Sequence, residues 1–364
     1  MYIFLKSLVL QLFKYSGAFA LLRFKNRHAL RILCYHGFSL HDEHEFMPGL
    51  FMAPAKFRAR MEFLKKAGFQ FLSLAVALKL WRQDKLPKNS LVLTVDDGFK
   101  STYTHAYPIL QELKIPMTLY LTSYYSAKEN PIFRLWLRYI FWKTKITVFD
   151  ASELAVSLKS TDKEAILWEL IAYGENQLAE KARWQLAQDL TKILAVTIPT
   201  HLKDQIFSLM NGQEIINAHR DGMDIQLHTH RHRFPHDLPL AEKEIIENRE
   251  YLSSLVDKPY HHFCYPSGEY HKKQFPLLEK CNIASATTCD FGINHRTDHP
   301  FALKRVLDGH SLSNIQIEAE LLGMGELFRT LKNWPKFLRT LPRRLTKLTS
   351  AAKTSGPRKP QEYR

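Results

Sequence analysis

The most constraining feature of this sequence is a short apolar run that ends in two adjacent acids. Residues 90–95 are nearly continuous in apolar side chains, and Asp96, Asp97 and Gly98 follow directly. A run of this kind predicts a strand buried on both faces, which is typical of a parallel sheet covered by helices. In α/β proteins the residues just beyond the carboxyl ends of parallel strands build the active site. The run therefore predicts both a fold class and the place of its chemistry.

Strand and helix patterns alternate along most of the chain. Apolar runs predict further strands at 31–35, 69–72, 117–121, 223–227, 260–265, 283–288 and 302–306. Helix-period patterns occur at 54–67, 74–80 and 107–113. The alternation predicts an α/β architecture with a parallel sheet, either open or closed. Residues from about 125 to 215 interrupt it with helical patterns that carry Trp136, Trp142, Trp168 and Trp184, so we expect a helical insertion there.

Composition excludes several classes of protein. With 45% hydrophobic and 24% charged residues in 364, the chain is neither disordered nor collagenous. Its cysteines, Cys34, Cys264, Cys281 and Cys289, are widely spaced and form no C-x-x-C pair. This spacing excludes a zinc ribbon and a disulfide framework, and we expect buried free thiols.

The net charge of +15 belongs to the two ends of the chain. Residues 1–31 carry six Lys/Arg and no acid, and residues 329–364 carry eleven Lys/Arg and one acid. The residues between them are nearly neutral, which argues against a nucleic-acid-binding groove.

Both ends combine basic and apolar residues. Residues 1–30 predict a basic amphipathic helix, residues 311–349 basic amphipathic helices, and residues 350–364 a disordered tail. Lys6, Gln11 and Lys14 interrupt the first apolar stretch, so no membrane span is predicted. We expect a cytoplasmic protein, with secretion the less favoured alternative. Solvated tails, a helix docked on the domain, and attachment to an anionic inner membrane face all stay open as interpretations of the ends.

A second polar cluster follows another predicted strand. His228, Thr229, His230, Arg231 and His232 come directly after residues 223–227. A single histidine there would fit an ordinary core or surface position, and the Asp-Gly pair alone would fit a turn with a helix cap. Alternate histidines at one strand end and paired aspartates at another together predict a metal site. Imidazole and carboxylate ligands suit Zn²⁺ best, with Co, Fe, Mn or Ni as alternatives.

These two clusters resemble motifs of the polysaccharide deacetylase family, also called the NodB-homology family or carbohydrate esterase family 4. Residues 94–98, Thr-Val-Asp-Asp-Gly, are similar to its T-F-D-D-G motif, and residues 228–232 match its H-[ST]-x-x-H motif. Further similarity covers residues 34–37, 54–57, 68–69 and 263–268. The resemblance implies a distorted (β/α) barrel over residues 31–310, with the helical insertion within it and the site at the strand ends.

The resemblance also implies roles for single residues. Asp97, His228 and His232 would hold the metal, and Asp96 would act as general base. A backbone N–H in the segment Tyr265, Pro266 and Ser267 would stabilise the oxyanion. Thr229 would orient the loop or a ligand.

Two positions depart from the family pattern. Cys264 stands where the family often has an arginine that partners the catalytic aspartate, so the tuning of the base is in doubt. The late histidine motif that often supplies the general acid has no match, which leaves His36 and His310 as candidates by position.

The implied function is that of a metal-dependent hydrolase of carbon–nitrogen bonds. It would remove acetyl groups from the acetamido groups of a sugar polymer or a lipid-linked saccharide, in exopolysaccharide or other carbohydrate metabolism. The alternatives are an O-acetyl esterase with the same site and a catalytically silent saccharide-binding scaffold. The partners are then an acetylated saccharide and an anionic membrane surface, with no nucleic acid, and the oligomeric state stays open.

Overall fold

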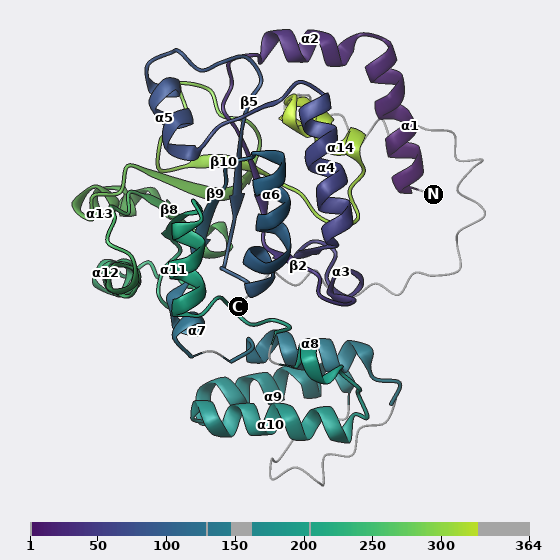
Figure 1. Cartoon of the computed structure of the whole chain (residues 1–364), viewed down its shortest axis with the longest axis vertical. Helices are drawn as coiled ribbons and strands as arrows, with labels where there is room; N and C mark the ends of the chain where they lie inside the picture. The colour runs from purple at the N-terminus through teal and green to yellow at the C-terminus, as the bar shows by residue number, and fades with distance from the viewer. Residues whose placement is uncertain (1, 129, 147–161, 204, 327–364) are drawn as a thin grey trace.

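Seven parallel strands form a closed ring at the centre of the molecule, with helices around it (Figure 1). The structure is a computed structural model that describes residues 2–128, 130–146, 162–203 and 205–326. The ring strands are β1 (Arg31–Tyr35), β5 (Ser90–Val95), β6 (Thr118–Leu121), β7 (Asp224–Leu227), β8 (His262–Cys264), β9 (Ser285–Phe291) and β10 (Leu303–Leu307). A short strand, β4 (Gln70–Phe71), pairs in parallel with the beginning of β5.

Strand β1 closes the ring because it pairs on both of its edges. Cys34 is in register with Thr94 of β5 and with Leu307 of β10. Since all the pairings around the ring are parallel, the carboxyl ends of the strands meet at one end of the barrel. The predicted α/β barrel is thereby confirmed, and the strands form within a few residues of their predicted bounds.

The side chains of β5 alternate between two apolar layers. Leu91, Leu93 and Val95 are fully buried in the large core between the strands and the surrounding helices. Val92 belongs to a smaller core that also contains Ile32 and residues from β6, β8 and β10. Because successive side chains of a strand point to opposite faces, this second layer fills the inside of the barrel. Burial on both faces explains why four of the six residues of β5 are apolar.

Helices cover the outside of the barrel. They are α4 (Pro54–Lys66), α5 (Leu74–Arg82), α6 (Tyr107–Leu113), α11 (Gly212–Arg220), α12 (Leu238–Leu255), α13 (Phe275–Lys280) and α14 (Asn314–Leu321). Shorter elements are β2 (Gly37–Phe38), α3 (Glu43–Phe46), β3 (Phe51–Met52), a π-helical turn (Thr102–Ala106), α7 (Ser123–Lys128) and 3₁₀ turns at Thr200–Leu202, Pro266–Gly268 and Lys272–Gln274. The helices predicted at 54–67, 74–80 and 107–113 correspond to α4, α5 and α6.

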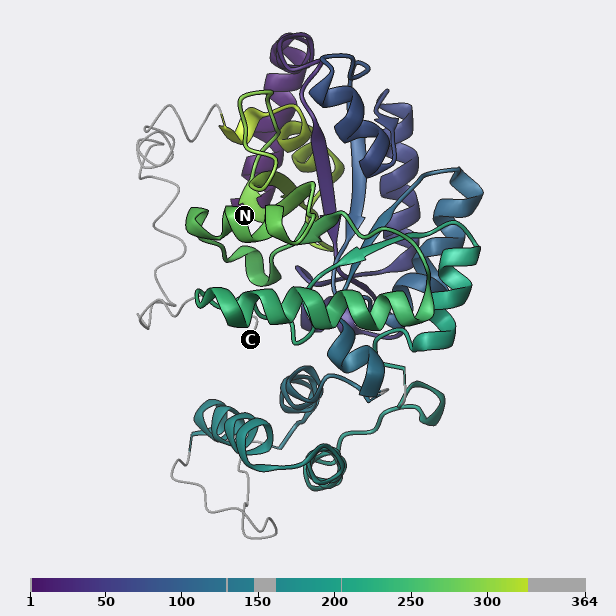
Figure 2. The ribbon, with the colours of Figure 1, turned by 90° about the vertical axis from the view of Figure 1, so that its left-hand side faces the viewer.

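The chain between β6 and β7 forms a helical layer around a second hydrophobic core, which also includes Phe51 and Phe99 from the end of the barrel. Its helices are α8 (Phe133–Lys143), α9 (Lys163–Gln177) and α10 (Glu180–Ile193). Trp136, Leu170 and Leu190 are buried in this core. The layer lies beyond the end of the barrel at which the strands finish (Figures 1 and 2). Tyr139 of α8 donates a hydrogen bond to Asp42 at the start of α3, which links the layer to the barrel.

The N-terminal residues form two helices rather than one, α1 (Tyr2–Tyr15) and α2 (Ala18–Lys25). Gly17 separates them with a φ of 85°, a left-handed conformation that glycine adopts without strain. No helix in the described part of the chain is long and apolar enough to span a bilayer. Of the predicted C-terminal helices at 311–349, residues 314–321 form α14 on the barrel. The remainder from residue 327, with the predicted tail, lies outside the described residues.

Candidate active site

A group of polar side chains lies inside the barrel where the strands end. Alternation along β5 brings Thr94 and then Asp96 to the side that Val92 occupies deeper in the barrel. Cys264 ends β8, and Arg305 lies two residues after Leu303 on β10. Each of these polar side chains is buried. The barrel interior is therefore apolar at depth and polar at the carboxyl ends of the strands.

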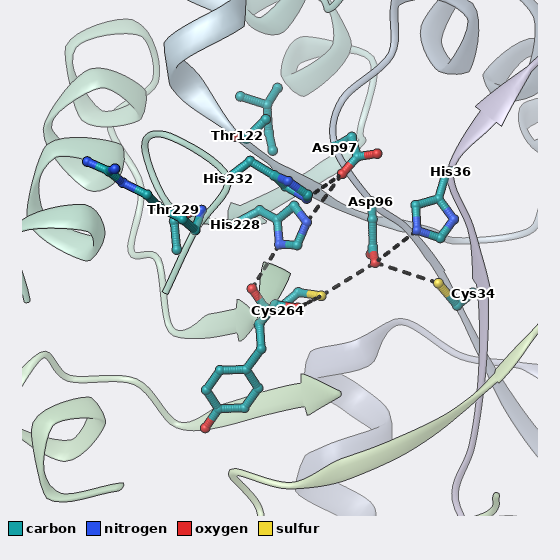
Figure 3. Close-up of polar contacts among 12 residues, drawn as sticks. Cys34, His36, Asp96, Asp97, Thr122, His228, Thr229, His232 and Cys264 are labelled. Carbon is teal, nitrogen blue, oxygen red and sulfur yellow. Dashed lines mark hydrogen bonds and ion pairs between the residues drawn. The ribbon is translucent and has the colours of Figure 1, made fainter. Parts of the chain in front are cut away.

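Asp97, His228 and His232 converge beside this group, as Figure 3 shows. Nε2 of His228 lies 3.3 Å from Oδ1 of Asp97, and Nε2 of His232 lies 3.2 Å from the same oxygen. One ligand atom from each of the three lies within 4.8 Å of the other two. The structure thus brings together the three residues to which the resemblance assigns the metal.

The chemistry of this trio fits a divalent metal such as zinc. Oδ1 of Asp97 is buried and accepts no hydrogen bond of ordinary geometry from the described residues. Burial alone would raise the pKa of Asp97, but the two imidazoles hold that pKa well below its usual range. One carboxylate and two imidazoles supply three ligands, which leaves a coordination position for water.

A backbone carbonyl orients the ring of His228 for this role. Nδ1 of His228 lies 2.8 Å from the carbonyl oxygen of Cys264. Because a carbonyl oxygen only accepts, Nδ1 carries the proton and Nε2 turns its lone pair toward Asp97. The backbone N–H of His228 donates to Oδ1 of Asn248 on α12, whose amide also donates to the carbonyl oxygen of Leu121 at the end of β6. Asn248, which the sequence analysis does not single out, therefore fixes the end of β7 against β6.

The loop after β7 is held in an unusual backbone conformation. Thr229 and His232 have φ values of 64° and 54°, in the left-handed region that β-branched and bulky residues seldom adopt. The hydroxyl of Thr229 accepts a hydrogen bond from the backbone N–H of Arg233 at 3.2 Å. Glu244 of α12 accepts one from the backbone N–H of Arg231 at 2.7 Å. Thr229 and Glu244 together maintain the curve that turns His232 back toward Asp97.

Asp96 has a different environment, in which fixed donors occupy both carboxylate oxygens. Arg305 donates from Nη1 to Oδ1 and from Nη2 to Oδ2, each at 2.7 Å. The thiols of Cys264 and Cys34 donate to Oδ2 at 3.4 and 3.6 Å. Burial alone would raise the pKa of Asp96, but the Arg305 guanidinium holds it at about 2. Asp96 is therefore ionised throughout the physiological pH range.

Arg305 also distinguishes between the possible metal sets. Cys34, His36 and Asp96 lie close enough together to hold a cation, and so do Asp96, His228 and Cys264. Both sets require an oxygen of Asp96, which already faces a buried positive charge that would repel the ion. The trio built on Asp97 has no such competitor among its own contacts.

Arg305 is the functional residue that the sequence analysis misses. The doubt about the tuning of the base came from Cys264 at the position where the family often has an arginine; in the structure a guanidinium from β10 lies next to Cys264 and contacts Asp96. Nη2 of Arg305 lies 3.2 Å from Sγ of Cys264, and its Nε donates to the carbonyl oxygen of Thr288 on β9. The available signal is the pair Lys304 and Arg305 in a strand pattern that is otherwise apolar: alternation directs one of the two into the barrel, where a fully buried arginine is costly without a partner.

Of the two histidines considered as general acids, the structure brings His36 to the site. Nε2 of His36 lies 3.8 Å from Oδ2 of Asp96. Burial lowers the pKa of His36 more than the neighbouring carboxylates raise it, so the ring is neutral at neutral pH. His310 follows β10 but is held by another segment, because its backbone N–H donates to the Pro48 carbonyl and its ring packs on His44. Nδ1 of His310 accepts a hydrogen bond from the backbone N–H of Ala53, 3.4 Å away, and the carbonyl oxygen of His310 accepts one from Lys56.

The segment 265–267 follows β8 directly and lies beside the site. Tyr265 is buried and its hydroxyl donates to the carbonyl oxygen of Phe301, 3.0 Å away. Its phenol therefore stabilises the barrel wall. Ser267 has a φ of 57° within the 3₁₀ turn. A contribution of this segment to an oxyanion site would come from its backbone.

Comparisons with known proteins show which proteins this chain is similar to. A sequence model of the polysaccharide deacetylase family matches residues 83–163 and 176–286. A 79-residue part of the chain, 22% of its length, is 32% identical to the poly-beta-1,6-N-acetyl-D-glucosamine N-deacetylase of Staphylococcus aureus (strain MSSA476). This match spans 27% of the relative, little more than a quarter of its length.

Solved structures show the same fold at low identity. The deacetylase PplD of Streptococcus pyogenes, in complex with acetate, aligns with a TM-score of 0.53 and 16% identity, over 81% of this chain and 99% of that one. IcaB from Ammonifex degensii aligns with a TM-score of 0.52 and 17% identity, over 81% and 98% of the two chains.

Proposed function

This chain belongs to the polysaccharide deacetylase family, and from that membership we propose that it is a metal-dependent N-deacetylase of an acetylated saccharide. The observation that carries the proposal is that the adjacent residues Asp96 and Asp97 have different partners, which suit them to different roles. Asp97 faces two imidazoles 3.2 and 3.3 Å away, while Asp96 is held ionised by Arg305. A metal site and a carboxylate base then lie side by side at the carboxyl ends of the strands.

Asp97, His228 and His232 are the residues that would hold the metal. Zinc bound there would supply an activated water and would polarise the acyl carbonyl. Asp96 would accept the proton of the attacking water, since its carboxylate is ionised and lies next to the metal ligands. Arg305 acts through Asp96, as a positioning residue that fixes the direction of the carboxylate and keeps it charged.

His36 is placed to complete the proton transfer. The C–N bond of the acetamido group breaks as the water oxygen binds the acyl carbon, and the leaving nitrogen needs a proton. A neutral imidazole 3.8 Å from Asp96 can take the proton from the carboxylate and pass it to that nitrogen. Acetate and a free amine are the products.

The substrate that we propose is a polymer of N-acetylglucosamine. The support is the similarity to the Staphylococcus aureus enzyme, whose name states a β-1,6-linked polymer of this sugar. A lipid-linked saccharide with the same acetamido group presents the same scissile bond.

The test is acetate release from β-1,6-linked N-acetylglucosamine oligomers by the purified full chain. We expect release that a chelator abolishes, that added zinc restores, and that Asp96→Asn loses while zinc still binds. An O-acetylated oligosaccharide serves as the second substrate, and faster release from it would favour the esterase alternative. Stoichiometric zinc without release from either substrate would favour the silent scaffold.

A second experiment tests the role of His36. His36→Gln should lower the rate of amide hydrolysis about a hundredfold, because the leaving amine loses its proton donor. Hydrolysis of 4-nitrophenyl acetate should change little, since nitrophenolate leaves without a proton. His310→Gln is the matched control and should leave both rates near those of the unmodified chain. Equal losses with the two substrates would show that His36 does not protonate the leaving group.

A further inference from the structure

The helices α1 and α2 present an apolar face to solvent. Leu8, Leu12 and Tyr15 follow one another at the spacing of successive helical turns, and Leu21 and Phe24 do the same on α2. All five are exposed, with Leu12 63% and Leu21 70% accessible. They make up five of the eleven exposed large apolar side chains in the described part of the chain. We call these five side chains the outer face of the hairpin.

The opposite side of the hairpin fixes it to the barrel. Leu10, Phe19 and Leu22 are buried in the main hydrophobic core. Lys14 of α1 and Arg23 of α2 both pair with Glu318 of α14, at 2.7 and 3.1 Å. The hairpin is therefore a docked part of the fold, and its outer face is held in a defined direction rather than on a loose terminus.

The charged residues of the hairpin itself have a single sign. No acid occurs in the sequence before Asp42. Lys25 is exposed beside Phe24, and the guanidinium of Arg27 lies 4.3 Å from the centroid of the Phe24 ring. Exposed leucines and aromatic rings on helices whose own charged residues are all basic are the pattern of a helix that lies in the surface of an anionic membrane.

We infer that the outer face of the α1–α2 hairpin docks on an anionic lipid surface. The apolar side chains would enter the boundary between headgroups and acyl chains, and Lys25 and Arg27 would lie among the headgroups. Residues 329–364 are not a matching occupant for this face, since they carry eleven Lys/Arg against one acid and would be repelled by its basic border.

The position of the hairpin also sets the direction of the catalytic site. Residue 25 ends α2 a few residues before β1 begins, so α2 lies at the end of the barrel where the strands start. Asp96, Asp97 and His228 lie where the strands finish. Figures 1 and 2 show α2 and the helical layer α8–α10 at opposite ends of the molecule. Figure 1 shows α1 running from there along the side of the barrel, so a chain docked at the corner of α1 and α2 turns the carboxyl ends of its strands away from the lipid.

Vesicle sedimentation tests the docking surface, with the full chain and without reference to catalysis. We expect the chain to bind vesicles of phosphatidylglycerol and phosphatidylcholine in equal parts, and to bind pure phosphatidylcholine much more weakly. Leu12→Glu with Leu21→Glu should lower the binding at least about tenfold. Leu240→Glu is the matched control, an exposed leucine on α12 that is 55% accessible, and should leave binding unchanged.

A second variant guards against loss of folding. Lys25→Gln with Arg27→Gln keeps the apolar side chains and should weaken binding about tenfold at low salt, with less effect as salt rises. Unchanged binding of both double variants would overturn the inference and assign the lipid contact to residues 329–364. A dimer that Leu12→Glu with Leu21→Glu converts to a monomer, without vesicle binding by the unmodified chain, would also overturn it.

Fluorescence quenching tests the direction of docking. Phe24→Trp adds an indole to the outer face, and Leu240→Trp adds one to the barrel side. With brominated lipid, we expect extra quenching for the first variant and none for the second, relative to the unmodified chain. Equal quenching of the two added indoles would overturn the proposed orientation.

Discussion

Asp96 and Asp97 are neighbours in the chain, yet the protein surrounds them in opposite ways. Asp97 faces two imidazole nitrogens, which accept a metal ion readily. Asp96 faces a guanidinium and two thiols, which are fixed donors. Burial is common to both, so the difference comes from the charged and polar partners alone.

The comparison teaches how two carboxylates remain charged in one buried place. Asp96 has a guanidinium that belongs to the fold, and Asp97 has two imidazoles with which it would hold a metal ion. Their pKa values are both lowered, for different reasons. The partners, rather than the aspartates themselves, therefore separate a base from a ligand.

Removing the ligand oxygen should have the largest effect. Asp97→Asn leaves two imidazoles and a weak amide ligand, so we expect zinc to be lost and the rate to fall roughly ten-thousandfold. Metal analysis after dialysis and acetate release measure the two effects. His230→Gln, in the same loop, is the control and should keep the zinc. Retention of zinc in Asp97→Asn would show that Asp97 is not needed as a metal ligand, and so would contradict the different roles proposed for the two aspartates.

Removing the base should lower the rate without removing the metal. For Asp96→Asn we expect a loss of about a thousandfold in kcat with one zinc still bound, because Asp96 lies outside the ligand trio. Parallel measurement of zinc content and kcat separates this variant from Asp97→Asn. If both variants lost zinc to the same extent, the two carboxylates would share one role.

Replacing the guanidinium should produce an intermediate effect. Arg305→Met leaves the buried Asp96 without its charge partner, and we expect a loss of about a hundredfold in kcat. The pKa of Asp96 should rise, so the acid side of the kcat–pH profile should move to higher pH.

Arg305→Lys, which keeps the charge, should recover part of the activity lost in Arg305→Met. Cys264→Arg added to Arg305→Met should also recover part of it, since it returns a guanidinium to the strand on which the family often has one. An unchanged pH profile in Arg305→Met would show that Arg305 serves the fold alone.

The smallest expected effect is on stability in acid. The pKa of Asp96 is about 2 in the folded chain and 3.8 without its partners, so the unfolded chain takes up the proton first as the pH falls. The stabilisation of the folded chain by ionised Asp96 is complete when the pH is well above 3.8, the pKa in the unfolded chain. It is lost as the pH falls toward 2, the pKa in the folded chain. We expect on the order of 1 kcal/mol of it to be gone by pH 3. Urea unfolding of metal-free protein at pH 5 and 3 measures this, and Asp96→Asn should show a smaller fall.

Local patterns predicted much of the fold and the two polar clusters from which the resemblance takes its three metal ligands. The apolar run before Asp96 and the histidines after residues 223–227 lie within single segments, so their positions follow from the strands that precede them. Arg305 is 209 residues from Asp96 in the sequence and meets it only because β1 brings β10 beside β5. No local pattern contains that adjacency.

Local sequence patterns also do not indicate which histidine, His36 or His310, lies at the site. Both follow a ring strand, but the loop after β10 bonds to Pro48 and carries His310 to His44. The short step from β1 to β2 leaves His36 at the barrel interior, 3.8 Å from Asp96. Asn248 and Glu244 act from α12, four residues apart on one helix face, and their role depends on how that helix packs.

The double pairing of β1 has a practical consequence for anyone who shortens this chain. The family match begins at residue 83 and ends at 286, so a fragment cut to those limits omits both β1 and β10. The cut also leaves only residues 285 and 286 of β9, so β5 and β8 become open edges whose unpaired backbone groups invite pairing with another copy. The same cut removes Arg305. Such a fragment would keep all three proposed metal ligands, but we expect it to aggregate. Its Asp96 would also lack the guanidinium that balances its charge.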